Sequence, residues 1–124
     1  MADGSTETMT QRILLLDIRD DPALIERYEA HHAAGAVPAA ITRSIREAGI
    51  LDMRIFRSGN RLVMVMDVTK DFDPAAKAAA DRSNPDVCAW EALMGELQQP
   101  LPWAPAGEKW IEARQIFALD QQSQ

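Results

Sequence analysis

The chain has 124 residues, of which 47% are hydrophobic and 26% are charged, as in an ordinary soluble globular domain. Its 19 acidic residues outnumber the 13 basic ones, and the formal net charge of −6 argues against binding to the phosphate backbone of nucleic acids. No apolar run approaches the ~18 residues of a membrane-spanning helix, so we expect neither a nucleic-acid nor a membrane partner.

A polar N-terminal segment precedes a predicted buried strand. Residues 1–11 lack the basic and apolar segments of a secretory signal peptide, so we expect a disordered tail and a cytoplasmic location. The short apolar run over 13–18 is typical of a buried strand. We expect one domain over 12–120, followed by a C-terminal tail over 121–124.

Two helices are predicted next. Asp21 before Pro22 combines a capping side chain with a proline at the first helical position, which starts a helix over 22–34. A second helix begins near Pro38 and stops at Gly49, because a glycine readily adopts the left-handed conformation that often ends a helix.

The middle of the chain predicts two strands joined by a tight turn. Residues 51–55 alternate between apolar and polar side chains, as a half-buried strand does. Residues 58–60 supply the turn, and residues 62–68 are apolar on both faces. The second strand is therefore expected at the centre of a sheet that is covered on both sides.

The last third of the chain repeats the helix signal and then returns to a strand. An acidic or amide side chain before a proline opens predicted helices over 74–81 and 85–97. Three prolines define an extended loop over 100–107, and residues 110–117 are predicted to form the closing strand.

This order of elements predicts an α+β fold of the ferredoxin-like split βαβ type. Such a fold has a four-stranded antiparallel sheet with helices on one face. Because both faces of 62–68 are apolar, the other side of the sheet also needs a cover. We therefore expect a homodimer in which two sheets pack face to face, as a dimeric α+β barrel.

Tyr28 and His32 are the pair with acid–base potential. They lie one helical turn apart, and an unperturbed imidazole, with a pKa of ~6.5, both gives and takes a proton near neutrality. Spacing alone leaves two interpretations open, a histidine satisfied in the core or at a helix end and a catalytic histidine. His31 points about 100° away and is expected at the rim.

The three tryptophans are the remaining candidates for a binding site. Trp90 and Trp110 are compatible with a core role and with stacking on a sugar, whereas Trp103 lies in a proline-rich loop, where a core role is harder to justify. The lone Cys88 is interpreted as a small buried hydrophobe. No spacing of His, Cys or acidic residues indicates a metal site, so none is expected.

Five segments in collinear order over 12–119 resemble the L-rhamnose mutarotase family: DPALIERYEAHH (21–32), GILDMRIF (49–56), NRLVMVM (60–66), WEALM (90–94) and QPLPWAPAGEKW (99–110). The last two are more similar to the branch of the family that is associated with L-fucose catabolism. The resemblance implies a dimeric ferredoxin-like isomerase without a cofactor. Its expected reaction interconverts the α and β anomers of a 6-deoxy-hexopyranose, with L-fucose favoured and L-rhamnose next.

The resemblance also assigns site residues. It places the proton donor at His32 and a sugar-contacting tyrosine at Tyr28. A second family tyrosine falls at Met53, where its hydrogen bond is absent, and a tryptophan pair falls at Trp90 and Glu91. The complete candidate site is catalytic His32 with substrate-binding Tyr28, Met53, Trp90, Glu91, Trp103 and Trp110.

One segment departs from the family pattern. Most relatives carry Trp-Pro-Glu shortly after the histidine, whereas this chain has Val37-Pro38-Ala39. Three interpretations follow: a different sugar, stacking by Trp103 and Trp110 instead, or loss of activity. The alternatives to a mutarotase are a catalytically silent sugar-binding module and a cofactor-free monooxygenase-like enzyme of the dimeric α+β barrel type.

Overall fold

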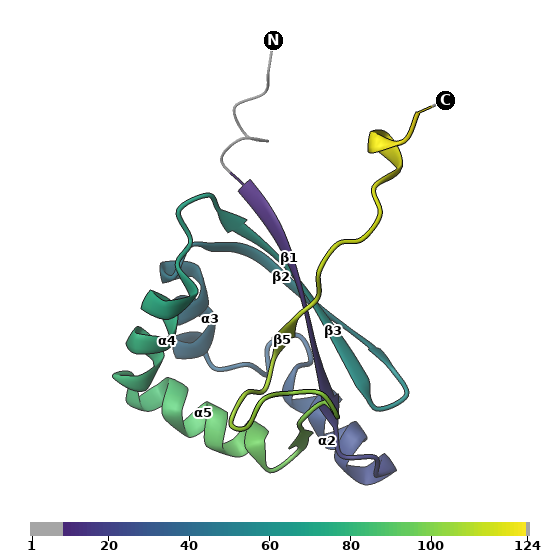
Figure 1. Ribbon diagram of the computed structural model, residues 1–124. Helices are drawn as coiled ribbons and strands as arrows, with labels where there is room; N and C mark the ends of the chain where they lie inside the picture. Colours follow the sequence, from purple (N-terminus) through teal and green to yellow (C-terminus); the bar gives the residue numbers. More distant parts are fainter. Residues whose placement is uncertain (1–8, 124) are drawn as a thin grey trace.

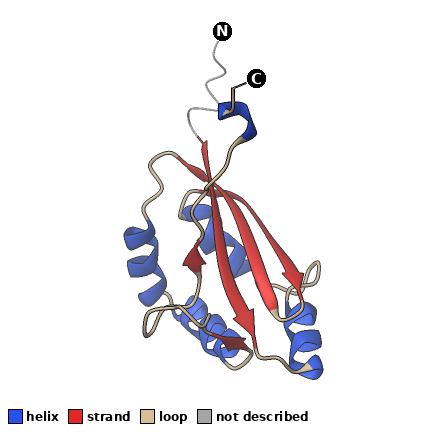
Figure 2. Cartoon of the chain, turned by 45° about the vertical axis from the view of Figure 1, so that its right-hand side comes forward, coloured by secondary structure: helices blue, strands red, loops and turns tan. Residues whose placement is uncertain are grey.

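Helices pack on one face of an antiparallel sheet in this computed structural model, which describes residues 9–123 (Figures 1 and 2). The strands are β1 (Met9–Ile18), β2 (Ile50–Ser58), β3 (Arg61–Thr69), β4 (Gln98–Gln99) and β5 (Ile111–Glu112). The helices are α2 (Pro22–His31), α3 (Ala39–Glu47), α4 (Pro74–Arg82), α5 (Pro85–Gly95) and a final 3-10 helix at Leu119–Gln121.

The strand order confirms the predicted fold class. It runs β2-β3-β1-β4, β5 also pairs with β1, and all pairings are antiparallel. Within residues 9–123 the sheet has five strands where four were predicted, because residues 98–99, to which no element was assigned, form β4. The predicted closing strand over 110–117 is regular only at Ile111–Glu112, and the chain beyond it leaves the sheet (Figure 1).

Side-chain caps begin α2, α4 and α5 as predicted. The side-chain oxygens of Asp21, Asp73 and Asn84 accept backbone N–H groups at 2.9, 3.0 and 3.0 Å at the starts of α2, α4 and α5. Gly49 follows the last turn of α3 with φ of +93°, also as predicted. The first helix is shorter than predicted, since it ends at His31 rather than at residue 34.

Alternation along β3 separates two faces of the sheet. The side chains at even positions point toward the helices and are buried: Leu62, Met64, Met66 and Val68. The opposite side of β1, β2 and β3 is here called the outer face. Register and alternation place the following apolar side chains on it: Ile13, Leu15, Phe56, Val63 and Val65.

The two predicted tails fall partly within the described residues. β1 begins at Met9, so positions 9–11 belong to a strand rather than to a tail, and residues 1–8 lie outside the described part of the chain. Near the other end, Gln121 closes the 3-10 helix. None of the helices within 9–123 has the length and apolar character needed to cross a membrane.

Candidate active site

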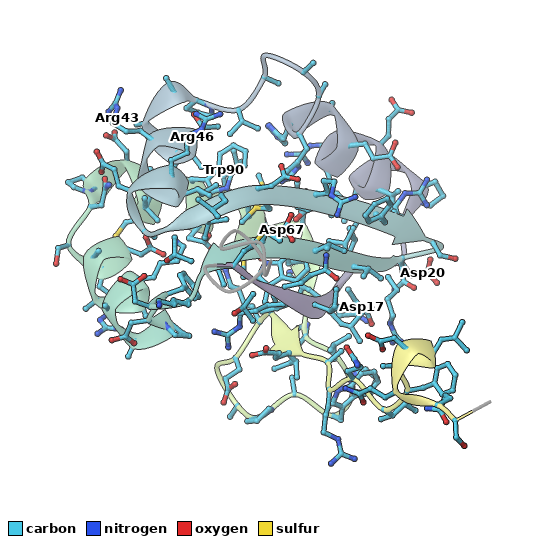
Figure 3. The ribbon with its side chains drawn as sticks, turned by 90° about the horizontal axis from the view of Figure 1, so that it is seen from above. Asp17, Asp20, Arg43, Arg46, Asp67 and Trp90 are labelled. Atoms are coloured by element: carbon cyan, nitrogen blue, oxygen red, sulfur yellow. The ribbon has the colours of Figure 1, made fainter. Side chains whose placement is uncertain are left out.

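A cavity of about 750 Å³ lies between the sheet and the helices. This volume falls within the ~300–1,000 Å³ of typical small-molecule sites. Trp90 projects from α5 into the space between the helices and the strands (Figure 3). Six of the seven predicted site residues line the cavity together: Tyr28, His32, Met53, Trp90, Glu91 and Trp110.

His32 caps the C-terminus of α2, and the backbone fixes the tautomer of its ring. Nδ1 lies 2.7 Å from the carbonyl oxygen of Tyr28. Because a carbonyl oxygen only accepts hydrogen bonds, Nδ1 carries the proton, and Nε2 of the neutral ring holds a free lone pair.

Burial lowers the pKa of His32 below the ordinary value of 6.5. The hydrogen bond to the Tyr28 carbonyl raises this pKa, and the charge of His31 lowers it again. Since burial is the largest of these effects, the imidazole is mostly neutral at pH 7. His32 therefore offers Nε2 as a proton acceptor at the wall of the cavity.

Two aromatic rings hold the imidazole between them. The Tyr28 ring stacks on it with centroids 4.3 Å apart and an interplanar angle of 25°. The Trp90 ring meets it edge to face at 5.5 Å and 69°. His31, predicted at the rim, is half-buried and lies 6.4 Å from the Trp90 ring. This packing restricts reorientation of the His32 ring.

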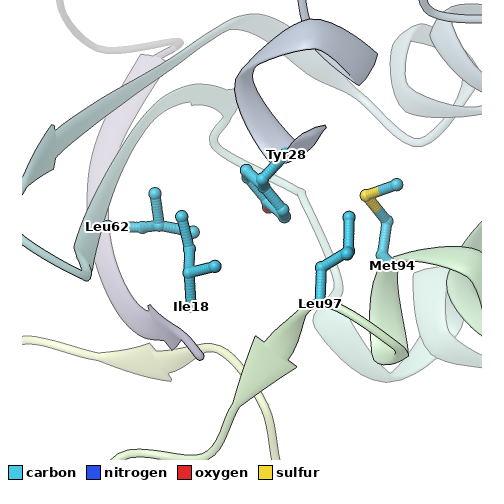
Figure 4. Close-up of a cluster of buried hydrophobic side chains, with 5 residues drawn as sticks. All are labelled: Ile18, Tyr28, Leu62, Met94 and Leu97. Atoms are coloured by element: carbon cyan, nitrogen blue, oxygen red, sulfur yellow. The ribbon is translucent and has the colours of Figure 1, made fainter. Parts of the chain in front are cut away.

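Tyr28 belongs to a buried hydrophobic cluster, whose other members are Ile18, Leu62, Met94 and Leu97 (Figure 4). Burial raises the pKa of the Tyr28 hydroxyl, although a hydrogen bond from Gln98 lowers it. The hydroxyl is therefore protonated at neutral pH and is able to donate. Nε2 of Gln98 donates to the Tyr28 oxygen over 3.5 Å.

Sequence analysis did not identify Gln98 as a site residue, although it lines the same cavity. Its side chain reaches the cavity because β4 pairs with the end of β1, where Gln98 lies opposite Ile18. A strand of two residues has no periodicity from which it could be predicted.

Two residues lie elsewhere than expected. Trp103 does not line the cavity: its ring lies 5.1 Å from the guanidinium of Arg61, which pairs with the buried Asp17. Both partners of this ion pair project on the outer face, so Asp17 and Trp90 lie on different sides of the strands (Figure 3). Cys88, interpreted as a buried hydrophobe, is exposed on α5, where its thiol lies against the carbonyls of Asp81 and Arg82 at the end of α4.

Comparison with known proteins places the chain in a family. A model of the L-rhamnose mutarotase family matches residues 12–119. The chain belongs to this family. It is also 49% identical over 114 residues to an L-fucose mutarotase from Xanthomonas campestris, and the match covers 92% of this chain and 91% of that protein.

Solved structures support the fold of this mutarotase family member. An L-rhamnose mutarotase from Formosa agariphila superposes with a TM-score of 0.63 at 16% identity, covering 89% of this chain and 98% of the other. A tetracenomycin F2 cyclase from Streptomyces glaucescens gives 0.56 at 18% identity, covering 88% and 95%. Both share the α+β architecture.

The segment that departs from the mutarotase family pattern lies at the start of α3. Val37 lines the cavity, whereas Pro38 is the N-cap residue of α3 and Ala39 is exposed. A small aliphatic side chain thus forms this part of the wall. Of the two tryptophans expected to compensate, Trp110 lines the cavity and Trp103 does not.

Lys109, next to Trp110 in the sequence, connects this segment to α5 by hydrogen bonds to Glu91. Its ammonium group donates to the backbone carbonyl and to the carboxylate of Glu91, both over 3.4 Å. Trp110 also packs against the two hydrophobic clusters on the helix-covered face of the sheet. Among residues 9–123, no three His, Cys, Asp or Glu side chains are grouped so as to hold a metal ion.

Proposed function

We propose that this enzyme interconverts the α and β anomers of L-fucose by acid–base ring opening, with His32 as the proton shuttle. The observation that carries the proposal is the hydrogen bond from Nδ1 to the Tyr28 carbonyl, which leaves Nε2 as a base at the wall of a cavity. The high identity to an L-fucose mutarotase supports L-fucose as the preferred sugar.

The reaction needs only the transfer of one proton between two oxygens of the sugar. Nε2 of His32 removes the proton of the anomeric hydroxyl, the bond between the anomeric carbon and the ring oxygen breaks, and the same proton passes to the ring oxygen. The resulting open aldehyde rotates and closes on its other face, with the proton moving in the reverse direction. Positioned acid–base catalysis supplies roughly 10²–10⁴-fold, which suffices for a reaction that already proceeds slowly in water.

The remaining cavity residues orient the sugar in this proposal. The protonated Tyr28 hydroxyl donates to a sugar oxygen beside His32, since the two rings are stacked. Trp90 and Trp110 offer apolar faces for the C–H groups of the pyranose. Met53 contributes an apolar wall, and Glu91 holds Lys109 at the segment before β5.

Saturation-transfer NMR at pH 7.5 tests the proposed reaction on equilibrated L-fucose, L-rhamnose and other 6-deoxy sugars. We expect the largest acceleration of anomer exchange for L-fucose. His32→Ala should abolish the acceleration without changing the melting temperature by more than a few degrees. His31→Ala is the matched control, because it removes the neighbouring imidazole and should retain the rate.

Two results would contradict the proposal. A His32→Ala variant that exchanges anomers at the wild-type rate would exclude His32 as the shuttle. A wild-type protein that binds L-fucose without accelerating exchange would identify a catalytically silent sugar-binding module instead.

We also propose that the chain forms a homodimer through the outer face of the sheet. The support is an apolar surface on the side that the helices leave uncovered, with Phe56 52% exposed and Val63 and Val65 only half-buried. Sedimentation velocity at micromolar concentration measures the state directly. We expect a dimer of about twice the chain mass, and a monomer would contradict the proposal.

A further inference from the structure

The amide of Gln98 is a buried polar group, and its carbonyl oxygen makes no hydrogen bond that would stabilise the fold. The residue is only 8% exposed and lines the cavity. Its Nε2 makes one long hydrogen bond to the Tyr28 hydroxyl, and its Oε1 has no hydrogen-bond partner within residues 9–123. Leaving a buried carbonyl unpaired costs stability, so an apolar side chain would serve the fold better.

The strand register explains why this amide faces the cavity. Gln98 lies opposite Ile18, and directly opposed residues of antiparallel strands point to the same face. Ile18 is fully buried in the hydrophobic cluster beneath Tyr28 (Figure 4). Gln99 points the other way and is exposed, so the two adjacent glutamines lie in opposite environments.

We propose that Gln98 is a substrate-binding residue, and that its amide and the Tyr28 hydroxyl together hold one hydroxyl group of the sugar. Oε1 of Gln98 accepts the proton of that hydroxyl, while the Tyr28 O–H donates to its oxygen. If the amide is rotated by 180°, Oε1 faces Tyr28 and Nε2 faces the sugar. The sugar hydroxyl then accepts from Nε2 and donates to the Tyr28 oxygen, because a hydroxyl both donates and accepts. This inference rests on the proposed function, since it takes a sugar as the ligand.

The position of the pair makes it selective for one hydroxyl configuration. Tyr28 stacks on His32 at 4.3 Å, so a sugar held by the Tyr28 hydroxyl lies next to the proton shuttle. A sugar whose hydroxyl points elsewhere leaves the buried amide unpaired, and a site built to pair with a hydroxyl discriminates strongly against ligands that lack it. Gln98 is therefore expected to discriminate between epimeric sugars.

Replacing Gln98 by Met tests the role, because methionine has a similar length and no polar amide. We expect KM for L-fucose to rise about tenfold, which is the loss expected for one hydrogen bond, with kcat changed less than about threefold. The melting temperature should stay equal or rise. Gln99→Met is the matched control on the exposed side, and it should leave KM, kcat and melting temperature unchanged.

A set of L-fucose analogues, each lacking one non-anomeric hydroxyl, identifies the group that Gln98 holds. In the wild type, removing that hydroxyl loses both hydrogen bonds and should raise KM by more than the roughly tenfold effect of Gln98→Met. In Gln98→Met the same removal should raise KM by a smaller factor, because only the bond from Tyr28 is left to lose. A Gln98→Met variant with the wild-type KM would overturn the inference. So would a lowered melting temperature with unchanged kinetics, which indicates a purely structural role.

Calorimetric titration with L-fucose separates this inference from the proposed function. If the wild type binds L-fucose but accelerates exchange of no sugar, the proposed reaction fails, and weaker binding by Gln98→Met would still support the inference. If the wild type binds no sugar, both fail.

Discussion

Burial changes the pKa values of the two stacked titratable groups at the cavity, His32 and Tyr28, in opposite directions. It disfavours the charged form of each, so it lowers the imidazole pKa of His32 and raises the phenol pKa of Tyr28. Over the neutral range both groups are therefore uncharged, one with a lone pair and the other with a proton. Such a pair suits a neutral substrate, because neither group brings a standing charge into an apolar cavity.

The pH dependence of anomer exchange should reflect the neutral imidazole. We expect kcat/KM to be constant above pH 7 and to fall as the pH drops through the pKa of His32, which lies below 6.5, because the protonated ring has no lone pair to accept a proton. Saturation-transfer rates across this range give the profile. His31→Ala should shift the acidic decline to higher pH, since the charge of His31 lowers the His32 pKa. A wild-type decline centred above 6.5 would contradict the assignment.

The two tryptophans near the C-terminus should differ in their effect on the sugar. Trp110→Leu removes an indole from the cavity wall, and we expect KM for L-fucose to rise about tenfold, or ~1.4 kcal/mol. Trp103→Leu is the comparison, because its ring contacts Arg61 instead, and KM should stay within about twofold of wild type. Equal effects of the two substitutions on KM would contradict the placement of the sugar.

The candidate site was partly predictable at the level of single residues. Tyr28 and His32 were expected side by side because one helical turn separates them, and helical spacing is local information. The amide of Gln98 was not predictable, because its burial depends on pairing with the first strand of the chain. The position of Trp103 outside the cavity was not predictable, because a proline-rich loop does not indicate which side of a sheet it will cover.

At the level of elements, strands with long hydrophobic patterns and helices with a specific capping sequence were predicted correctly. β1, β2 and β3 have nine or ten residues each, so their hydrophobic patterns are clear, and the Asp-Pro and Asn-Pro junctions mark three helix starts. β4 and β5 have two residues each and exist only because β1 offers a free edge. Their positions depend on pairing with β1, which is distant in the sequence, so no local sequence pattern predicts them.

The junction between α3 and β2 should be sensitive to substitution. Gly49 has φ of +93°, and a Cβ there would lie 2.9 Å from Oγ1 of Thr69, so Gly49→Ala should lower the free energy of unfolding by roughly 2–3 kcal/mol. Gly59→Ala is the matched control. It also has a positive φ, +58°, but no atom within 4 Å of the added Cβ, and it should cost only about 1 kcal/mol.

Urea unfolding monitored by tryptophan fluorescence compares the two glycine variants. The difference between their free energies of unfolding isolates the contact with Thr69 from the backbone conformation. Equal losses would mean that the Thr69 side chain rotates away freely. Since Gly49 leads directly into the strand that carries Met53, we expect Gly49→Ala to impair sugar binding as well.

The whole molecule has two unlike sides, a helix-covered side with the cavity and an uncovered outer face. The proposed dimer would cover the apolar outer face and leave each cavity between the sheet and helices of its own chain. The C-terminal segment carries additional exposed apolar side chains, with Ile116 86% and Phe117 63% exposed. In a dimer these side chains are available to contact the second subunit.

A charge at the centre of the outer face should dissociate the proposed dimer. Val63→Asp places a carboxylate between its two apolar cross-strand partners, Leu15 and Phe56, and burying it unpaired against a second sheet is strongly unfavourable. We expect a monomer by sedimentation velocity at a concentration where the wild type is a dimer. Ala76→Asp adds the same charge on the exposed side of α4 and should remain dimeric. A dimeric Val63→Asp would place the interface elsewhere.

The acceptor that orients the imidazole is a main-chain oxygen, and this has an evolutionary consequence. No exchange of side chains removes a peptide carbonyl, so the base survives mutation of its surroundings as long as the helix end persists. Residues of the cavity wall such as Val37 can thus change in evolution without removing this hydrogen bond. In the proposed mechanism, the backbone would orient the catalytic ring, whereas side chains would set the preference for a sugar.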